Sequence, residues 1–254
     1  MLTLIVPIYN EGKNVSILTE AVLLAMGKVE EGSFEILFID DSTDSTPEIL
    51  EGLSREHSVV RFLHREEERG LGSAIVRGFQ EARGDVLAVM DGDLQHPPNL
   101  MPLMLSLIGE GYDLVLPSRF IPGGEDGGLS LFRKIVSLTA RYMAKVLLRR
   151  VRSISDPTGG CFMMKRDVIR GIDFDAGSWK ILIEVLVKGQ YARVVELPYH
   201  FHARELGVSK LSATAQIDYV RHLKTLFFSM ESSSRCLCDG STPFAKVQID
   251  RVLL

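Results

Sequence analysis

Two aspartates with one residue between them follow a short apolar run in the first half of the chain. Asp91 and Asp93 flank Gly92 directly after residues 86–90. Hard divalent cations prefer carboxylate oxygens, and Mg²⁺ in particular keeps coordination positions open for substrate phosphates. A glycine between the carboxylates lets a ligand approach the backbone closely. The pattern predicts a site for a cation and a phosphorylated or hydroxylated ligand; the alternative is an ordinary turn that ends a strand.

A second acidic pair, Asp40 and Asp41, follows the apolar run 34–39. Two carboxylates at the end of a neighbouring strand repel each other unless a cation, a base edge or ribose hydroxyls lie between them. The alternative is that they cap the next helix, a role that Asp44 or Ser45 can also fill. We therefore expect a binding role for Asp41 more than for Asp40.

The elements that position these residues alternate regularly over the first 90 residues. Short apolar runs predict strands, apolar residues at helical spacing predict helices, and the two kinds alternate as in a parallel sheet with right-handed crossovers. Ligands of such sheets bind beyond the carboxyl ends of the strands, where both acidic pairs fall. The expected strands are 2–8, 34–39, 59–64 and 85–90, and the expected helices are 14–26, 45–53 and 72–82.

The alternation ends after a further strand expected at 113–117. Beyond it the sequence predicts a glycine-rich loop, a long helix, a late strand, a polar loop and a terminal helix. Residues 231–254 are serine-rich and then mixed, and are expected to form a loose tail or a docked extension. The ranges for the middle elements are 121–128, 129–150, 193–201, 204–212 and 213–230.

Composition excludes several classes of protein. The 254 residues carry 29 Lys and Arg against 33 Asp and Glu, a net charge of −4, which argues against a general nucleic-acid binder. Three cysteines cannot form a disulfide framework, which favours a reducing cytosol. No apolar run is long enough to span a bilayer, and no basic segment precedes Pro7 as in a signal peptide. We expect a soluble cytosolic enzyme.

Residues 129–155 contrast with this acidic balance, because they hold seven basic residues and no acidic one. At 100° per residue, five of the basic side chains fall within an arc of roughly 80°. A basic amphipathic helix of this kind is typical of proteins that lie on an anionic membrane surface; the alternative is a solvated surface helix. The five are Lys134, Arg141, Lys145, Arg149 and Arg152.

Taken in order, these motifs resemble those of the inverting GT-A glycosyltransferases of family 2, and specifically the dolichol-phosphate mannose synthase group. The resemblance runs from about residue 3 to 212. It implies an α/β protein of the GT-A fold, a single Rossmann-like domain at 1–230 with a mainly parallel sheet flanked by helices. Its donor-binding half is about 1–118 and its acceptor half about 119–230. The matching segments are 7–11, 40–46, 70–74, 91–98, 118–119, 132–134, 156–162 and 204–211.

The resemblance also implies a role for each matching residue. The nucleoside of a nucleotide-sugar would be held by Pro7, Tyr9, Glu11, Ile39 and Asp41. The diphosphate and sugar, with Mg²⁺ or Mn²⁺, would be held by Asp91, Gly92, Asp93 and Gln95. Phosphates of donor or acceptor would be bound by Arg119, Arg133, Lys180, Arg204 and Lys210. The residues implied in catalysis are Asp93, Arg119, Arg133 and Asp156, the last at the position where related transferases place a base.

Two departures from the family pattern bear on the acceptor. Residues 41–45 lack the usual glycine-bearing turn, and residues 159–161 differ from the usual Ser-Gly-Phe. The expected reaction is inverting transfer of mannose from GDP-mannose to a dolichyl or polyprenyl phosphate at the cytosolic face of a membrane, by a peripheral protein. The alternatives are a UDP-glucose donor, a saccharide or protein hydroxyl acceptor with Asp156 as base, and a binding module without turnover.

A phosphate acceptor is largely ionised near neutral pH, because the second pKa of a phosphate monoester is about 6. It can attack the anomeric carbon without a dedicated base, whereas a hydroxyl acceptor requires one. Asp156 is followed by Pro157 in a neutral turn, so we expect it to orient its neighbours.

Overall fold

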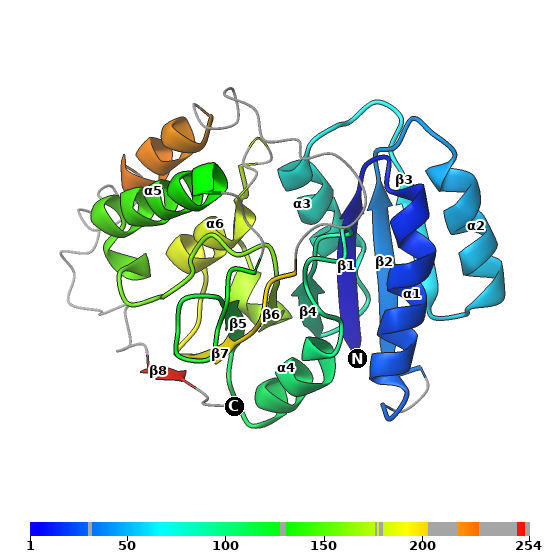
Figure 1. Ribbon diagram of the computed structural model, residues 1–254, viewed down its shortest axis with the longest axis horizontal. Helices are drawn as coiled ribbons and strands as arrows, with labels where there is room; N and C mark the ends of the chain where they lie inside the picture. Colours follow the sequence, from blue (N-terminus) through cyan, green and yellow to red (C-terminus); the bar gives the residue numbers. More distant parts are fainter. Residues whose placement is uncertain are drawn as a thin grey trace.

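The computed structural model describes residues 1–29, 32–127, 131–175, 177, 180–202, 218–228 and 248–251. Within these ranges one sheet has the strand order β3-β2-β1-β4-β6-β5-β7-β8 (Figure 1). Neighbouring strands are parallel except where β6 pairs with β4 and with β5. The strands are β1 (Leu2–Ile8), β2 (Phe34–Asp40), β3 (Val60–His64), β4 (Val86–Val89), β5 (Leu114–Ser118), β6 (Phe162–Lys165), β7 (Arg193–Pro198) and β8 (Gln248–Arg251).

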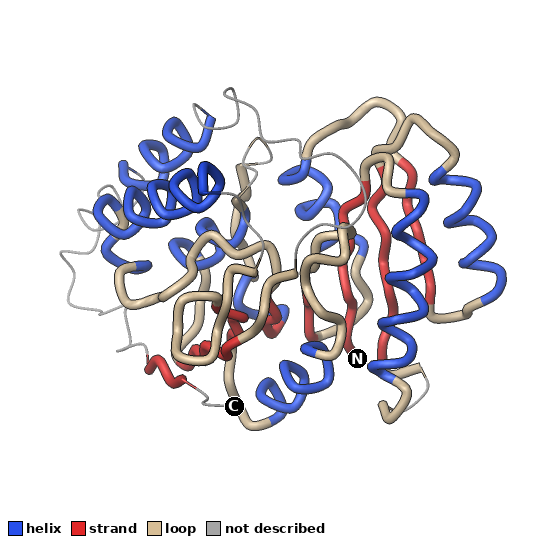
Figure 2. Tube along the Cα trace, viewed as in Figure 1, coloured by secondary structure: helices blue, strands red, loops and turns tan. Residues whose placement is uncertain are grey.

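Helices cover both faces of the sheet (Figure 2). One face packs against α1 (Gly12–Met26), α2 (Thr46–Glu56) and α4 (Leu100–Gly109). The other packs against α3 (Leu71–Glu81), α5 (Leu131–Leu147), α6 (Ile181–Lys188) and a helix at 218–228. Two short 3₁₀ turns flank β6 in the chain: η1 (Arg149–Val151) precedes it and η2 (Arg166–Ile169) follows it.

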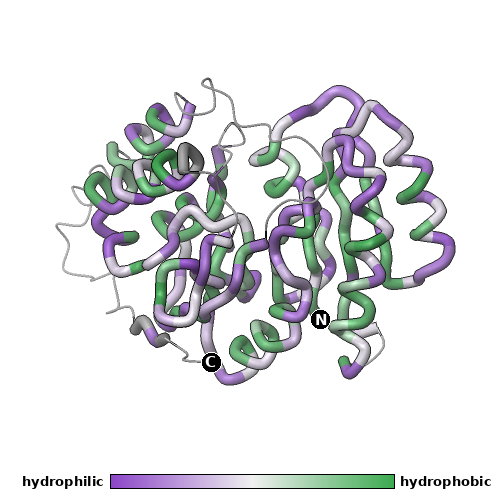
Figure 3. The backbone as a smooth tube through the Cα atoms, viewed as in Figure 1, coloured by the Kyte–Doolittle hydropathy of each residue, from purple (hydrophilic) through white to green (hydrophobic). Residues whose placement is uncertain are grey.

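Alternation along each strand builds the two cores. In β1, Leu4 and Val6 face the α1 side, whereas Ile5 faces the α3 side, and all three are fully buried. A strand buried on both faces needs an apolar residue at nearly every position, which explains the near-continuous apolar runs. Hydrophilic residues gather instead in loops, such as the one that joins β3 to α3 at the top of the view (Figure 3).

The structure confirms the predicted strand and helix alternation up to β4, and it adds elements that the sequence did not predict. Helix α4 lacks a helical period because it is apolar almost throughout; it packs beside α1 and against β5 and β6. Helix α6 and the four-residue strand β6 are further elements of this kind. Part of the predicted tail, β8, docks beside β7.

The outward face of α5 differs from the prediction. Its most exposed large side chains are apolar: Ile135 is 55%, Tyr142 59% and Val146 68% exposed. The basic residues, which share one arc of the helix, lie along one side of this face, where Lys134 pairs with Asp126 at 2.9 Å. The outward face is therefore apolar, and the predicted basic arc flanks it on one side. No helix in the described part of the chain combines the length and hydropathy needed to cross a membrane.

Candidate active site

Strands β1, β2, β4 and β5 all end at one edge of the sheet, because they run parallel in the same sheet. Strand β1 begins beside the N-terminus and runs upward in Figure 1, so this edge lies toward the top of the view. Strand β6 runs the opposite way and begins at this edge. The loop 156–161 that precedes β6 is therefore delivered to the same edge as the loops that follow β4 and β5.

The loop after β4 carries the predicted cation ligands. Asp91 is partly exposed and has the Nε2 atom of buried His96 3.6 Å from its Oδ2. The Oδ1 atom of buried Asp93 accepts a hydrogen bond of 3.2 Å from the backbone N–H of Gln95. The side-chain amide N–H of Gln95 donates to the carbonyl of His202 at 3.0 Å, which leaves the amide oxygen as the atom suited to a cation.

These donor atoms fit Mg²⁺ or Mn²⁺. Two carboxylates and an amide oxygen are hard ligands, which both ions accept. No group of three or more His, Cys, Asp or Glu side chains in the described ranges is arranged to hold a metal ion. Asp91, Asp93 and Gln95 by themselves would fill only part of a coordination shell, which leaves positions for diphosphate oxygens.

Gly92, between the two aspartates, is buried against β1. A Cβ atom added there would lie 2.3 Å from Cδ1 of Ile8. A side chain at this position would displace the end of the buried Ile8 side chain, so packing against β1 by itself favours a glycine here, and the approach of a ligand to Gly92 stays a prediction.

Arg119 follows β5 and forms a buried ion pair with Asp156. The Nε and Nη2 atoms of Arg119 donate to the two carboxylate oxygens at 2.7 and 3.1 Å, and the Thr158 hydroxyl donates to Oδ1 at 3.3 Å. The guanidinium also lies over the rings of Phe120 and Phe201, at 5.1 and 5.2 Å. Burial acts to lower the pKa of Arg119, but Asp156 outweighs it and the pKa is raised. Asp156 is thus held as the partner of a cation.

Lys180 precedes α6 and extends into the same region. Its Nζ donates to the carbonyl of Thr158 at 2.7 Å. Burial of the ammonium lowers the pKa of Lys180 to about 8; Asp91 and Asp156 act to raise it and Arg119 to lower it. The structure therefore brings Asp91, Arg119, Asp156 and Lys180 into one electrostatic group.

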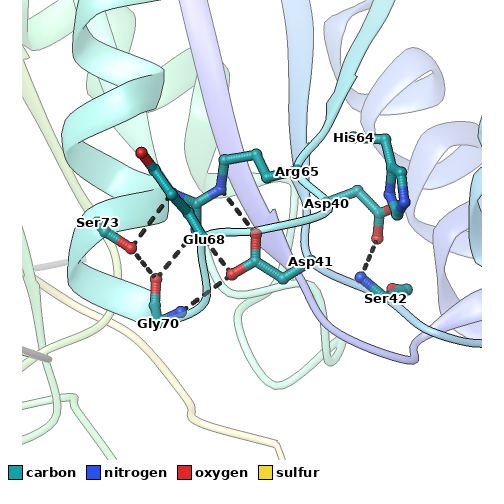
Figure 4. A network of polar contacts seen from close by, with 8 residues as sticks. All are labelled: Asp40, Asp41, Ser42, His64, Arg65, Glu68, Gly70 and Ser73. Atoms are coloured by element: carbon teal, nitrogen blue, oxygen red, sulfur yellow. Dashed lines mark hydrogen bonds and ion pairs between the residues drawn. The ribbon is translucent and has the colours of Figure 1, made fainter.

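Asp41, after β2, is held in a buried network with Arg65, which follows β3 (Figure 4). The Nε and Nη2 atoms of Arg65 each donate to a carboxylate oxygen at 2.7 Å, and the backbone N–H of Gly70 donates to Oδ2 at 3.0 Å. Arg65 also donates to Glu68 at 3.0 Å and to Ser73 at 3.2 Å. The network fixes the loop before α3 against the end of β2. Arg65 was not predicted; its position directly after a strand, at the same edge as Asp41, was the signal available.

Asp40 is fully buried and pairs with His64, whose Nδ1 lies 2.6 Å from Oδ2. Its Oδ1 accepts a hydrogen bond from the backbone N–H of Ser42 at 3.1 Å. These contacts account for Asp40 as a structural residue, in line with the weaker expectation for it.

The other residues predicted to hold the nucleoside lie around the end of β1. Pro7 is buried, Tyr9 is 36% exposed, and Glu11 accepts a hydrogen bond from Asn14 at 2.6 Å. Ile39 is fully buried in the core, so only its backbone could meet a ligand. Arg204 and Lys210 lie outside the described residues, as does the side chain of Arg133.

Comparison with known sequences gives matches over most of this chain. The sequence profile described as "Glycosyl transferase family 2" matches residues 3–172. A dolichol-phosphate mannosyltransferase from Pyrococcus furiosus is 38% identical over 88% of this chain and 63% of its own length. One from Saccharomyces cerevisiae is 34% identical over 89% of this chain and 86% of its own length. The chain thus spans less than two thirds of the archaeal relative.

Solved structures share the fold at lower identity. Glucosyl-3-phosphoglycerate synthase from Mycobacterium tuberculosis, in complex with Mn²⁺, UDP-glucose and phosphoglyceric acid, has a TM-score of 0.62 and 19% identity, over 91% of this chain and 79% of its own. A mannosyltransferase from Pyrobaculum calidifontis, in complex with GDP-Man and Mn²⁺, has a TM-score of 0.59 and 17% identity, over 96% of this chain and 66% of its own. They confirm the predicted GT-A fold.

Proposed function

Because the chain belongs to glycosyl transferase family 2, we propose that it transfers mannose, with inversion, from GDP-mannose to a dolichyl or other polyprenyl phosphate. The names of its archaeal and yeast relatives support the sugar and the lipid acceptor. The GDP-Man and Mn²⁺ of the Pyrobaculum complex support the donor and a divalent cation. Within this chain, the observation that carries the proposal is the buried pairing of Asp156 with Arg119.

The proposed binding of the donor rests on the oxygen ligands after β4. Asp91, Asp93 and Gln95 would hold Mg²⁺ or Mn²⁺, which neutralises the charge that develops on a departing diphosphate. The nucleoside would lie along the ends of β1 and β2, near Tyr9 and Asp41. Because both oxygens of Asp41 already accept hydrogen bonds from Arg65, Asp41 would present the edge of a fixed carboxylate to the nucleoside.

The proposed reaction with the acceptor follows from the chemistry of phosphate. An oxygen of the lipid phosphate attacks the anomeric carbon from the face opposite the nucleotide. The bond from that carbon to the diphosphate oxygen breaks, its electron pair leaves with GDP, and the configuration inverts. No proton has to be removed, because the nucleophile is already ionised. The protein must supply cations, and Arg119 and Lys180 are the described candidates, with Arg133, Arg204 and Lys210 proposed beside them.

A hydroxyl acceptor would place a different demand on Asp156, which would have to accept its proton as a general base. The two hydrogen bonds from Arg119 and the one from Thr158 direct the carboxylate toward protein groups. A carboxylate that stabilises a neighbouring guanidinium is suited to orienting that cation, which favours the phosphate acceptor.

We place the reaction at the cytosolic face of a membrane, with α5 as the contact. A shallow groove of about 590 Å³ runs along its outward side. An apolar helix face with a basic flank suits the boundary between lipid headgroups and acyl chains, because it buries apolar area while its cations meet anionic lipids. The groove is lined by Ile135, Leu138, Thr139, Tyr142, Met143, Val146 and Leu147.

The experiment that tests this function is transfer of radiolabelled sugar from GDP-mannose, or from UDP-glucose, into the organic phase with polyprenyl phosphate. Each donor is assayed with Mn²⁺, with Mg²⁺ and with EDTA. The expected result is lipid-soluble label from GDP-mannose alone, abolished by EDTA. Label from UDP-glucose alone would overturn the donor, and undiminished transfer in EDTA would overturn the cation. An absence of lipid-soluble label from either donor would overturn the lipid acceptor.

A further inference from the structure

The loop before β6 approaches the first aspartate of the predicted cation site at Gly160. A Cβ atom added to Gly160 would lie 2.2 Å from Oδ2 of Asp91, 3.0 Å from its Cγ and 3.3 Å from its Oδ1. Non-bonded carbon atoms pack best at about 3.5–4.0 Å, and a contact of 2.2 Å lies far inside that range. The carboxylate of Asp91 therefore occupies the volume that any side chain at position 160 would need.

The sheet register explains this close approach. Strands β4 and β6 are antiparallel, with Val89 paired to Phe162. Continuing this register by two residues beyond each strand places Asp91 opposite Gly160. The one antiparallel strand in the middle of the described sheet thus brings a glycine to the carboxylate that follows β4.

A second group lies against the same carboxylate. The His96 ring is 2% exposed and packs against Tyr199, with ring centroids 5.5 Å apart, and against Phe201, at 5.3 Å. Its Nε2 atom is 3.6 Å from Oδ2 of Asp91. Asp91 is therefore confined between a packed imidazole and the Cα atom of Gly160.

We propose that Gly160 is a positioning residue for Asp91. Because Gly160 has no side chain, the Asp91 carboxylate can lie where it does, and its position sets how tightly the site binds a divalent cation with a nucleoside diphosphate. The inference deepens the proposed function, since it takes Asp91 as a cation ligand. It assigns Gly160 no contact with substrate; the residue acts through Asp91.

The expected effect of Gly160→Ala on cation binding depends on which group moves to make room for the new methyl group. The atom that a new methyl group meets first is the end of the Asp91 side chain, so rotating that carboxylate relieves the clash without moving the backbone. Gly160 does not have the positive φ at which an alanine is strained. The fold should keep its stability while the cation ligand is displaced.

The neighbouring residue supplies a matched control. A Cβ atom at Gly159 would meet no atom closer than the Asp156 carbonyl oxygen at 3.7 Å, an ordinary contact, and Gly159 also lacks a positive φ. Gly159→Ala makes the same chemical change in the same loop, with the same effect on the entropy of the unfolded chain. It differs only in leaving Asp91 in place.

The test is calorimetric binding of Mn²⁺ in the presence of GDP to the full chain, with thermal unfolding measured in parallel. Wild type, Gly159→Ala and Gly160→Ala are compared, each also in an Asp91→Ala background. Disturbing a group that orients a metal ligand weakens metal affinity by about 10–100-fold, and we expect a loss of this size for Gly160→Ala alone. In the Asp91→Ala background Gly160→Ala should have no further effect.

Equal Mn²⁺ affinity in the two glycine variants would overturn the inference, as would a further loss from Gly160→Ala when Asp91 is absent. Absence of Mn²⁺ binding to the wild type would overturn it too. If Gly160→Ala fails to fold, recovery of folding with Asp91→Ala would support the clash, and failure there would refute it. Wild type that binds Mn²⁺ with GDP but transfers no mannose would refute the proposed function alone.

Discussion

Removing the carboxylate of Asp156 should be among the most destabilising single changes in this chain. Asp156 is 1% exposed, and its partner Arg119 has a side chain that is 8% exposed. Asp156→Ala deletes both acceptors of the bidentate pair and leaves a guanidinium buried between aromatic rings without its counter-charge. The cost arises mainly from this uncompensated charge.

The magnitude follows from the burial of both partners. Removing one member of a buried ion pair costs about 3–5 kcal/mol in the free energy of unfolding. For a domain of this size 1 kcal/mol shifts Tm by about 2–4 °C, so Tm should fall by about 6–20 °C. Replacing both partners by apolar residues is often close to neutral. The double variant Arg119→Met with Asp156→Ala should therefore be more stable than Asp156→Ala alone.

Thermal and urea unfolding of the wild type, both single variants and the double variant measure this coupling. Asp126→Ala serves as the matched control, because Asp126 pairs with Lys134 at 2.9 Å near the surface and should contribute only about 0–1 kcal/mol. A cost below about 1 kcal/mol for Asp156→Ala, or additive single effects, would refute the pairing and return Asp156 to the role of a base.

Three further predictions concern other parts of the site. Lys180 is charged below its pKa of about 8, so the affinity for anionic substrates, measured as KM, should weaken as pH rises through 8. Lys180→Arg should flatten this dependence, because arginine stays charged. Arg65→Met should lower the free energy of unfolding in urea by about 3–5 kcal/mol, since it strands the buried carboxylate of Asp41. Tyr142→Glu and Val146→Glu should each weaken sedimentation with anionic vesicles about tenfold, from ~1.5 kcal/mol of lost apolar burial.

Each of these has a result that would contradict it. A KM that is flat from pH 7 to 9 in the wild type would remove Lys180 from the substrate region. An Arg65→Met variant as stable as the wild type would mean that the network of Figure 4 does not form. Vesicle binding that is unchanged in both α5 variants, but lost in high salt, would assign membrane contact to charges elsewhere.

The first half of the fold could be predicted because each strand there is an apolar run with polar residues at its carboxyl end. Residues 2–8 and 34–40 pair in parallel along their whole length, and their boundaries are visible in the sequence. The second half was harder because its elements are short or lack a period. Strand β6 has four residues, and the order that inserts it between β4 and β5 depends on long-range pairing.

The site could be predicted where its residues are close in sequence. Asp91, Asp93 and Gln95 share one loop, so type and spacing were sufficient to group them. Arg65 lies in a run of charged residues that is typical of a solvated loop, and its burial depends on Asp41, 24 residues away. Gly160 was visible only as part of a departure from a family pattern, because its role depends on the register of β6 against β4.

Transfer to an ionised lipid phosphate without a protein base is tested most directly by changing the acceptor alone. Polyprenyl phosphate and the polyprenol of the same chain length are each offered to the wild type with radiolabelled GDP-mannose and Mn²⁺. The predicted result is mannose on the phosphate and none on the alcohol, because only the phosphate is a nucleophile without proton removal. Mannose on the polyprenol at a comparable rate would contradict the prediction and show that a base, with Asp156 as first candidate, acts in this site.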